Sequence, residues 1–202
     1  QVTAHGAIAA GHPLTAETGA NVLREGGNAV DAAVAAILTS FIAESPLTGM
    51  GAGGFMLVHT PGGENRLLDF FVSAPATVAP QADQVEFMVD FSGALQQFNG
   101  GAASCGVYGT PAGIWQALER FGTMSMRDLA APAVKLSREG VPTSEVHEFL
   151  YRILTPILIH WPEGRAIYAP TGQTPRTGEL LKFIDFGEAI ERFAQEGPEP
   201  FY

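Results

Sequence analysis

The chain has 202 residues, of which 46% are hydrophobic and only 16% are charged. This composition fits one domain, or a large part of one, with a substantial core, and it excludes a mainly disordered protein. The formal net charge of -10 argues against nucleic acid and anionic membranes as partners. Because Cys105 is the only cysteine, no internal disulfide can form. The sequence shows no recognisable signal peptide or transmembrane run.

The first part of the chain predicts a short strand followed by two helices. The strand is expected at residues 7–10, and the first helix at residues 15–25 with Thr15 as its cap. Asn28 is a good N-cap for the second helix, over Ala29–Ala43, and Asp31 takes the capping-box position. Because nearly every residue of this segment is apolar, we expect the helix to be buried on all sides.

A glycine-rich loop follows, with Gly49, Gly51 and Gly54 in G-x-G-x-x-G spacing. The dinucleotide fingerprint of this spacing follows a strand and opens a helix, whereas the loop here follows a helix and opens a strand. We therefore interpret the glycines as permitting positive φ and close backbone packing. Residues 55–59 predict a buried strand, and residues 67–72 a second strand that pairs with it in a hairpin.

The rest of the chain predicts one further strand and four helices. Alternating apolar and polar residues over 85–91 are typical of a half-buried strand, and Asn99-Gly100-Gly101 of a turn. The helices are expected at residues 110–121 with Thr110 as cap, 125–140 with Ser125 as cap and a kink at Pro132, 144–154 before Pro156, and 185–197 with Asp185 as cap. This order of elements indicates an α/β (α+β) fold, with helices packed on a sheet.

The polar residues by themselves provide no convincing catalytic group. The five histidines lack metal-ligand spacing such as H-E-x-x-H, and G-x-S-x-G is absent. No activating base is evident beside Cys105, so we expect a buried, inert thiol. Asp69 and Glu86 are not evidently paired, which leaves a two-carboxylate mechanism without support. We predict no metal, no cofactor and no catalytic residue in this chain.

Several segments, taken in order, resemble the γ-glutamyltranspeptidase family. The most specific is Gly-Gly-Asn-Ala-Val-Asp-Ala-Ala-Val-Ala at residues 26–35. The resemblance covers essentially the whole chain. Its further matching segments are residues 51–57, 69–75, 109–113, 121–124, 131–140 and 197–202.

The resemblance implies an N-terminal nucleophile (Ntn) hydrolase, made as a precursor that cuts itself into two chains. Both chains would build an αββα four-layer sandwich. Residues 1–202 would be the N-terminal portion of the large subunit, a single domain incomplete without the small subunit. The Thr that begins the small subunit would attack a small-molecule amide, with its own α-amine as base, and form an acyl-enzyme. The resemblance suggests a periplasmic or secreted protein, and a cytoplasmic location stays open because no targeting segment is recognised.

One motif departs from the family pattern, at the candidate substrate-binding residues Phe71, Val72 and Ser73. The family offers Asp-Phe-Arg-Glu-x-Ala-Pro, whose Arg holds the α-carboxylate of the γ-glutamyl group, whereas residues 69–75 read Asp-Phe-Phe-Val-Ser-Ala-Pro. Phe71 stands in place of the Arg, and an apolar ring cannot donate a bidentate pair to a carboxylate. Losing such a charged hydrogen bond would weaken glutamyl binding about ten- to a hundredfold.

Three functions therefore remain open. The first is γ-glutamyl hydrolysis or transfer, with substrates of the glutathione type. The second is an amidase or acylase that acts on a different acyl group, because Phe71 replaces the Arg. The third is a non-catalytic binding protein on the same frame. For Phe71 and Val72 themselves, the alternative to a pocket is that they only extend a buried strand, with the carboxylate bound elsewhere.

Overall fold

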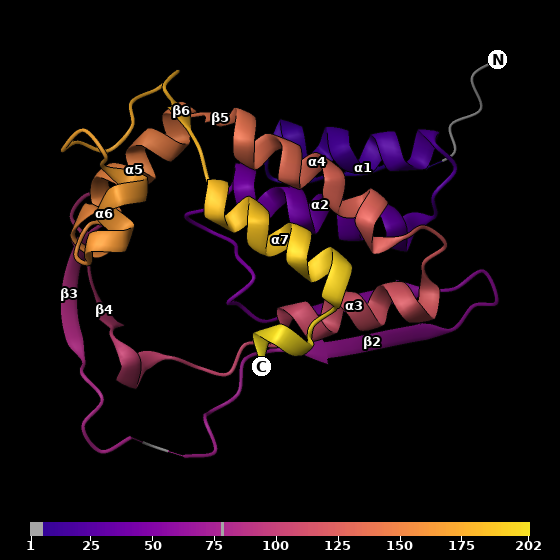
Figure 1. Ribbon diagram of the computed structural model, residues 1–202, viewed down its shortest axis with the longest axis horizontal. Coiled ribbons are helices and arrows are strands. Elements are labelled where there is room, and N and C mark those ends of the chain that lie inside the picture. Colours follow the sequence, from indigo (N-terminus) through magenta and orange to yellow (C-terminus); the bar gives the residue numbers. More distant parts are fainter. Residues whose placement is uncertain (1–5, 78) are drawn as a thin grey trace. The chain divides into compact units, whose positions relative to one another are not determined.

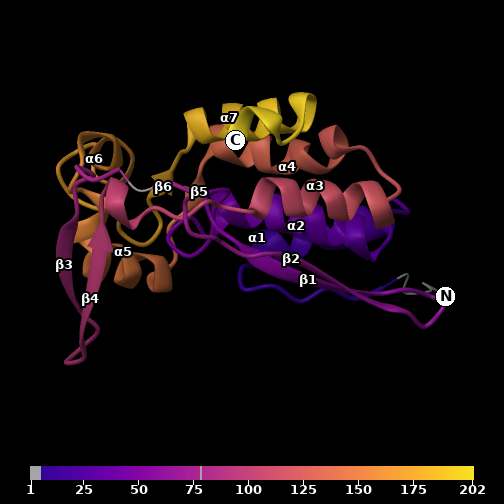
Figure 2. The same cartoon turned by 90° about the horizontal axis from the view of Figure 1, so that it is seen from below.

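A computed structural model describes residues 6–77 and 79–202, and these divide into two compact units (Figures 1 and 2). The first unit comprises the described residues up to Val72, Tyr108–Glu139 and Phe183–Tyr202, and the second comprises those of Ser73–Val107 and Gly140–Lys182. The first contains α1 (Pro13–Arg24), α2 (Ala29–Ala43), β1 (Gly54–His59), β2 (Asn65–Phe70), α3 (Thr110–Phe121), α4 (Met126–Glu139), α7 (Ile184–Glu196) and the 3-10 helix η2 (Glu199–Phe201). The second contains β3 (Val85–Asp90), β4 (Leu95–Gly100), the 3-10 helix η1 (Ala102–Ser104), β5 (Val141–Pro142), α5 (Glu145–Leu158), α6 (Pro162–Tyr168) and β6 (Leu180–Leu181). Helices and small antiparallel sheets agree with the predicted α/β class.

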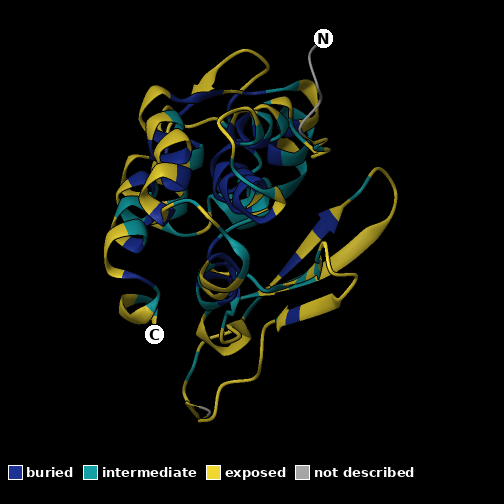
Figure 3. Ribbon diagram, turned by 90° about the vertical axis from the view of Figure 1, so that its right-hand side faces the viewer, coloured by how far each residue is buried: buried dark blue, intermediate teal, exposed yellow. Residues whose placement is uncertain are grey.

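Helix α2 is the centre of the first unit. Its bounds, Ala29–Ala43, are those predicted, and most of its residues are buried. It packs against α1, α3 and α4, and Figure 3 shows it largely in the dark blue of buried residues. The predicted burial on all sides is thus confirmed, and the covering helices belong to this chain.

The N-terminus of α2 is joined to the segment after α3 through the Asp31 carboxylate. The Asn28 side chain accepts from the N–H groups of Val30 and Asp31 at 2.8 and 3.0 Å, and Asp31 accepts from Asn28 N–H at 2.8 Å, which completes the predicted capping box. The same buried carboxylate accepts from Thr123 N at 2.8 Å, Thr123 Oγ1 at 2.6 Å and Met124 N at 3.1 Å. Burial raises the pKa of this carboxyl, but the hydrogen bonds, those from Thr123 foremost, outweigh it and hold the pKa below its ordinary value.

Strands β1 and β2 form the predicted hairpin, with Phe55 opposite Asp69 and Leu57 opposite Leu67. On one face Leu68 is buried, and α3 packs against β2. On the other face Phe55, Leu57 and Leu67 are 59%, 68% and 64% exposed. The prediction of a buried strand was wrong for this face. Alternate side chains of a strand point to opposite sides, and the described residues cover only one side of the hairpin.

Helices α1 and α3 begin with caps other than the predicted threonines. The N-cap of α1 is His12, whereas the Thr15 hydroxyl lies inside the helix and donates to Glu44 at 2.8 Å. Similarly, Thr110 is already helical, and its hydroxyl donates to the backbone carbonyl of Ala52 at 2.8 Å. Both hydroxyls bond to distant segments, so neither is free to cap its own helix.

Three further predictions are corrected by the structure. Residues 7–10 form no strand, because they have no ladder partner among the described residues. Helix α5 continues through Pro156 to Leu158, since a proline this close to the end of a helix disturbs only its last turn. The N-cap of α7 is Phe183, and Asp185 lies in its first turn, where a carboxylate favours the helix dipole.

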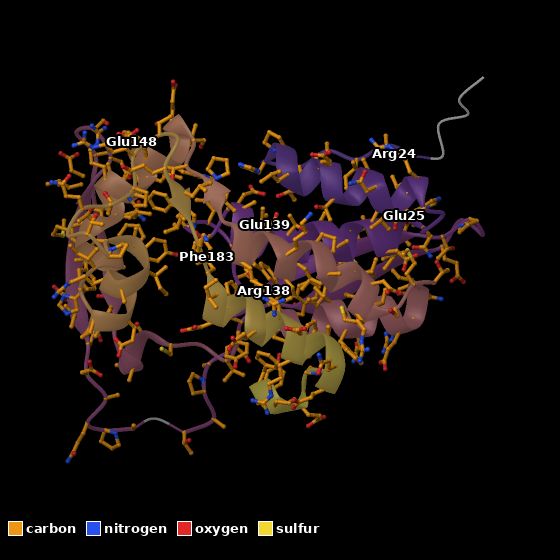
Figure 4. The ribbon with its side chains drawn as sticks, turned by 45° about the horizontal axis from the view of Figure 1, so that its top comes forward. Arg24, Glu25, Arg138, Glu139, Glu148 and Phe183 are labelled. Atoms are coloured by element: carbon orange, nitrogen blue, oxygen red, sulfur yellow. The ribbon has the colours of Figure 1, made fainter. Side chains whose placement is uncertain are left out.

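Helices α4 and α7 pack closely against each other in the first unit. A Cβ added to Gly187 of α7 would lie 1.8 Å from the Ser137 hydroxyl oxygen of α4. Arg138, labelled in Figure 4, pairs with Glu191 of α7 at 2.6 Å. Because both charged side chains are about half exposed, the ion pair contributes little, and the close approach at Gly187 is the stronger constraint.

The second unit contains a hairpin of β3 and β4. Strand β3 alternates as predicted, with Phe87 and Val89 buried and α5 packed against the strand. Strand β4 was not predicted. Residues 99–100 belong to it, and the turn instead lies at Ser92 and Gly93, with φ of 60° and 103°. The polar, largely exposed sequence of β4 carries no apolar alternation that would reveal a strand.

Each of the two segments that form the second unit is closed at its ends. Ser73 and Val107 form an isolated antiparallel bridge, with N–H to carbonyl oxygen distances of 3.0 and 2.8 Å. Strands β5 and β6 pair in the same way, with Val141 opposite Leu181. The beginning and the end of each segment therefore lie side by side.

Candidate functional site

The candidate substrate-binding residues Phe71 and Val72 follow the last residue of β2. The Phe71 N–H donates to the Asp69 carboxylate at 3.0 Å, which turns the chain at the end of the strand. Phe71 is 57% exposed and Val72 is 40% exposed. Among the described residues, neither extends a buried strand, and their contact with substrate stays a prediction. Both lie beyond β2, on the surface of the first unit.

The ring of Phe71 stacks on the ring of Phe55 in β1. The ring centroids are 5.4 Å apart and the ring planes differ by 10°. Phe55 lies opposite Asp69, and the stacking contact places the Phe71 ring, just beyond the end of β2, beside Phe55. The sequence analysis missed Phe55 as a neighbour of the site. The signal that could have found it is the hairpin register, because diagonal positions on one face are within reach of aromatic side chains.

The third candidate residue, Ser73, begins the second unit. It is exposed, and its backbone forms the bridge with Val107. The structure thus gives Ser73 a backbone role at this bridge, and its contact with substrate stays a prediction.

Backbone contacts at two glycines hold the end of β2. A Cβ on Gly53 would lie 2.4 Å from Val72 N, and a Cβ on Gly109 would lie 2.2 Å from the Phe70 carbonyl oxygen. Both distances are far shorter than any real carbon contact, so neither position leaves room for a side chain. The position of residues 71–72 is therefore set by packed backbone and not by flexible side chains.

The glycine-rich loop connects α2 to β1, as predicted. Positive φ was expected among its glycines, but no glycine between residues 49 and 54 has it. Close packing is the reason for glycine at Gly53, whereas a Cβ on Gly49 or Gly51 would meet nothing within 4 Å. The loop is also tied to α3, because Thr110 donates from its hydroxyl and its N–H to the Ala52 carbonyl at 2.8 and 3.2 Å.

At the candidate site, the described residues present two exposed apolar side chains, Phe71 and Val72. The thiol of Cys105 was expected to be buried, but it is exposed and lies 3.5 Å from the Gly101 carbonyl oxygen. Within residues 6–77 and 79–202, no three His, Cys, Asp or Glu side chains are grouped to hold a metal ion. In the same residues no helix is long and apolar enough to cross a membrane. The chemistry of the site is that of an apolar wall beside the Asp69 carboxylate.

Comparison with known proteins places this geometry in a family. A family model described as gamma-glutamyltranspeptidase matches residues 15–202. A glutathione hydrolase proenzyme of Bacillus subtilis is 32% identical over 206 residues, covering 98% of this chain and 33% of the relative. The acylase ACY 1 proenzyme of a Pseudomonas species is 31% identical over 205 residues, covering 98% of this chain and 36% of the relative. The chain thus spans about a third of the length of these relatives.

Solved structures agree with the sequence matches. The γ-glutamyltranspeptidase of Helicobacter pylori aligns with a TM-score of 0.84 at 27% identity, covering 100% of this chain and 57% of that one. A cephalosporin acylase of Bacillus halodurans shares the fold, with a TM-score of 0.79 at 24% identity over 95% of this chain and 36% of that one. The fold is that of part of an Ntn hydrolase of the α/β class. The chain belongs to the γ-glutamyltranspeptidase family.

Proposed function

We propose that this chain is the N-terminal portion of the large subunit of a self-cleaving amide hydrolase or acyltransferase. The observation that carries the proposal is the family match over residues 15–202. The matched residues include Gly53 and Gly109, the two glycines packed against the end of β2. The relatives are named as proenzymes and are about three times as long as this chain. A partner subunit from the same precursor would supply the nucleophile. This chain would supply the α2 core and one wall of the acyl site.

The proposed reaction proceeds through an acyl-enzyme. The hydroxyl of a Thr at the start of the partner subunit attacks the amide carbonyl, and the α-amine of that Thr takes the hydroxyl proton. The amine leaving group then departs with a proton, and water or an amine acceptor releases the acyl group. In this scheme residues 71–72 contact the acyl group and take no part in proton transfer.

The identity of the acyl group depends on position 71. A glutamyl donor carries an α-carboxylate and an α-ammonium group, and burying either without a partner is costly. Phe71 offers an exposed ring that donates no hydrogen bond, and the charge beside it is the Asp69 carboxylate. We therefore favour an uncharged acyl group, and one relative is named as an acylase. The second candidate is γ-glutamyl hydrolysis or transfer, in keeping with the relatives named glutathione hydrolases.

The first expected result is self-cleavage of the full precursor. After expression, a denaturing gel should show two chains in place of one, and mass spectrometry should find Thr as the first residue of the smaller chain. Replacing that Thr with Ala should leave a single uncut chain. A wild-type precursor that stays uncut, or a small chain that begins with a residue lacking a nucleophile, supports the non-catalytic binding protein instead.

The second expected result concerns Phe71. The mature wild-type enzyme should cleave pentanoyl-p-nitroanilide with a higher kcat/KM than γ-glutamyl-p-nitroanilide. Phe71→Arg should move this ratio toward the glutamyl donor by about tenfold or more, because the new guanidinium can pair with the α-carboxylate. Phe71→Leu is the matched control and should not improve the glutamyl donor. Efficient wild-type turnover of the glutamyl donor that Phe71→Arg abolishes would show that other residues hold the carboxylate.

A further inference from the structure

The pair formed by Phe55 and Phe71 is an unusual feature of the outward hairpin face. Phe55 belongs to β1 and Phe71 immediately follows β2, and their rings lie nearly parallel and are each more than half exposed. Exposed apolar side chains are ordinary when they stand alone. Here Leu57 and Leu67 continue the same face, so four large apolar side chains are adjacent. Contiguous patches of this kind mark binding surfaces.

The outward face of the second hairpin also exposes large apolar side chains, but it carries no aromatic ring. In β3 the buried side chains are Phe87 and Val89, and the outward ones are Glu86, Met88 and Asp90, with Leu95 of β4 opposite Asp90. Acidic residues flank Met88 on that face. Strands β1 and β2 are instead rich in apolar residues on both faces, a pattern typical of strands covered on both sides.

Phe55 and Phe71 lie beside backbone segments that pack closely against glycines. Phe71 immediately precedes Val72, whose backbone nitrogen lies 2.4 Å from the place that a Cβ on Gly53 would take, and Phe55 is two residues after Gly53. Phe70, the last residue of β2, is in turn packed against Gly109. Rings on a support of this kind lose little freedom when a ligand stacks on them, which favours selective binding.

The charge beside Phe55 and Phe71 further limits which acyl groups could bind there. Asp69 lies opposite Phe55, so its carboxylate is on the face that carries both rings. Arg66 is opposite Val58 and belongs to the other face. Because Phe71 stands in place of the family's Arg, no cation of this motif offsets Asp69, and a carboxylate-bearing acyl group would meet repulsion. An uncharged aromatic ring would meet the two phenyl rings.

We propose that Phe55 is a second specificity-determining residue of the acyl site, and that Phe55 and Phe71 together select an uncharged acyl group with an aromatic ring. This inference rests on the proposed function, since it takes position 71 as part of the acyl site. It names a residue and a substrate class that the family pattern at residues 69–75 does not give.

The test compares two anilides of matched shape in the mature full-length enzyme, phenylacetyl-p-nitroanilide and cyclohexylacetyl-p-nitroanilide. The wild type should prefer the phenyl donor in kcat/KM by about 2- to 10-fold, the range expected for an aromatic pair. Phe55→Leu keeps apolar bulk but removes the ring, so the ratio should fall to about one, whereas Phe55→Tyr should retain it. Met88→Ala removes an exposed apolar side chain of β3, outside this patch, and should leave the ratio unchanged.

The outcomes separate this inference from the proposed function. If the precursor matures but the wild type cleaves neither anilide nor γ-glutamyl-p-nitroanilide, the proposed function fails. If the wild type cleaves anilides and the phenyl preference is absent, or survives Phe55→Leu, the role of Phe55 is overturned. An equal loss of the ratio in Met88→Ala also overturns it. If both Phe55→Leu and Phe55→Tyr block self-cleavage, the face is covered by the rest of the precursor and is not an acyl site.

Discussion

Replacing Asp31 with Ala is expected to lower the free energy of unfolding by about 3 kcal/mol or more. Its carboxylate accepts hydrogen bonds from Asn28 N, both donors of Thr123 and Met124 N. Ala would leave these donors without their partner in a buried location. It would also break a link between segments 92 residues apart in sequence. Thermal or urea denaturation of the full-length protein measures the loss.

A matched control exists in the same chain. Asp128 stands three residues after Ser125 at the start of α4, as Asp31 does after Asn28, and its carboxylate accepts from the Ser125 hydroxyl at 2.6 Å. This second pair is exposed. Asp128→Ala should therefore cost about 1 kcal/mol or less. Equal losses at the two positions would contradict the view that burial and the links to residues 123–124 make Asp31 special.

The pKa of Asp31 gives its contribution a defined sign with pH. The folded-state pKa lies below the ordinary 3.8, so between these two values the unfolded chain binds more protons than the folded one. The stabilisation is complete above 3.8 and is lost as the pH falls through the folded pKa. The Tm difference between the wild type and Asp31→Asn should shrink as the pH drops below 3.8. A difference that widens on acidification would show that the pKa is raised instead.

The other large effect is expected at Gly53. A Cβ there would lie 2.4 Å from Val72 N and 2.7 Å from the Phe71 carbonyl carbon, so the clash is with backbone that cannot rotate away. Gly53→Val, with two further methyl groups, should lower stability by about 3 kcal/mol and abolish self-cleavage of the precursor. Denaturing gels measure the cleavage, and the Tm of the uncut chain measures the stability.

Neighbouring glycines provide graded controls for this prediction. At Gly54 the nearest atom to an added Cβ is a ring carbon of Phe70 at 3.1 Å, and a side chain can shift by the small amount needed. At Gly51 an added Cβ meets nothing within 4 Å. The expected order of damage for substitutions to Ala is therefore Gly53, then Gly54, then Gly51. Similar damage at Gly51 would mean that the loop is constrained by something other than the close approach to residues 71–72.

Local patterns in the sequence were enough to predict much of the fold. The bounds of α2, its Asn28 cap and its burial follow from one apolar run behind a capping box. The helix ends predicted at residues 25, 140 and 197 also agree with the structure to within a residue, and Gly26, Gly140 and Gly197 at these ends have positive φ. These features depend on residues close together in the chain, which is why a single sequence reveals them.

Features that depend on distant residues could not be predicted in this way. Thr15 and Thr110 look like caps until their hydroxyls are seen to bond to Glu44 and Ala52. Strand β4 is polar and exists because β3 pairs with it. The exposure of Phe71 was likewise hidden, because an apolar run predicts burial without saying which chain covers it.

At the candidate site, the residues could be predicted from the sequence, but their neighbours in space could not. The departure from the family pattern pointed to Phe71, Val72 and Ser73. It did not show that the first two lie on the first unit with Phe55 stacked beside them, or that the backbone of Ser73 pairs in the second unit. Those relations come from hairpin register and chain path.

The closed ends of the two segments in the second unit have a consequence for how this chain can change. Each segment leaves and rejoins the first unit through adjacent residues, at Ser73 with Val107 and at Val141 with Leu181. A segment whose first and last residues are already adjacent can be lengthened, shortened or exchanged at a small cost in loop-closure entropy. Such a change need not move the residues that pack around α2. The second unit is thus built from two replaceable modules, and variation in size among homologous proteins can accumulate there while the α2 core stays intact.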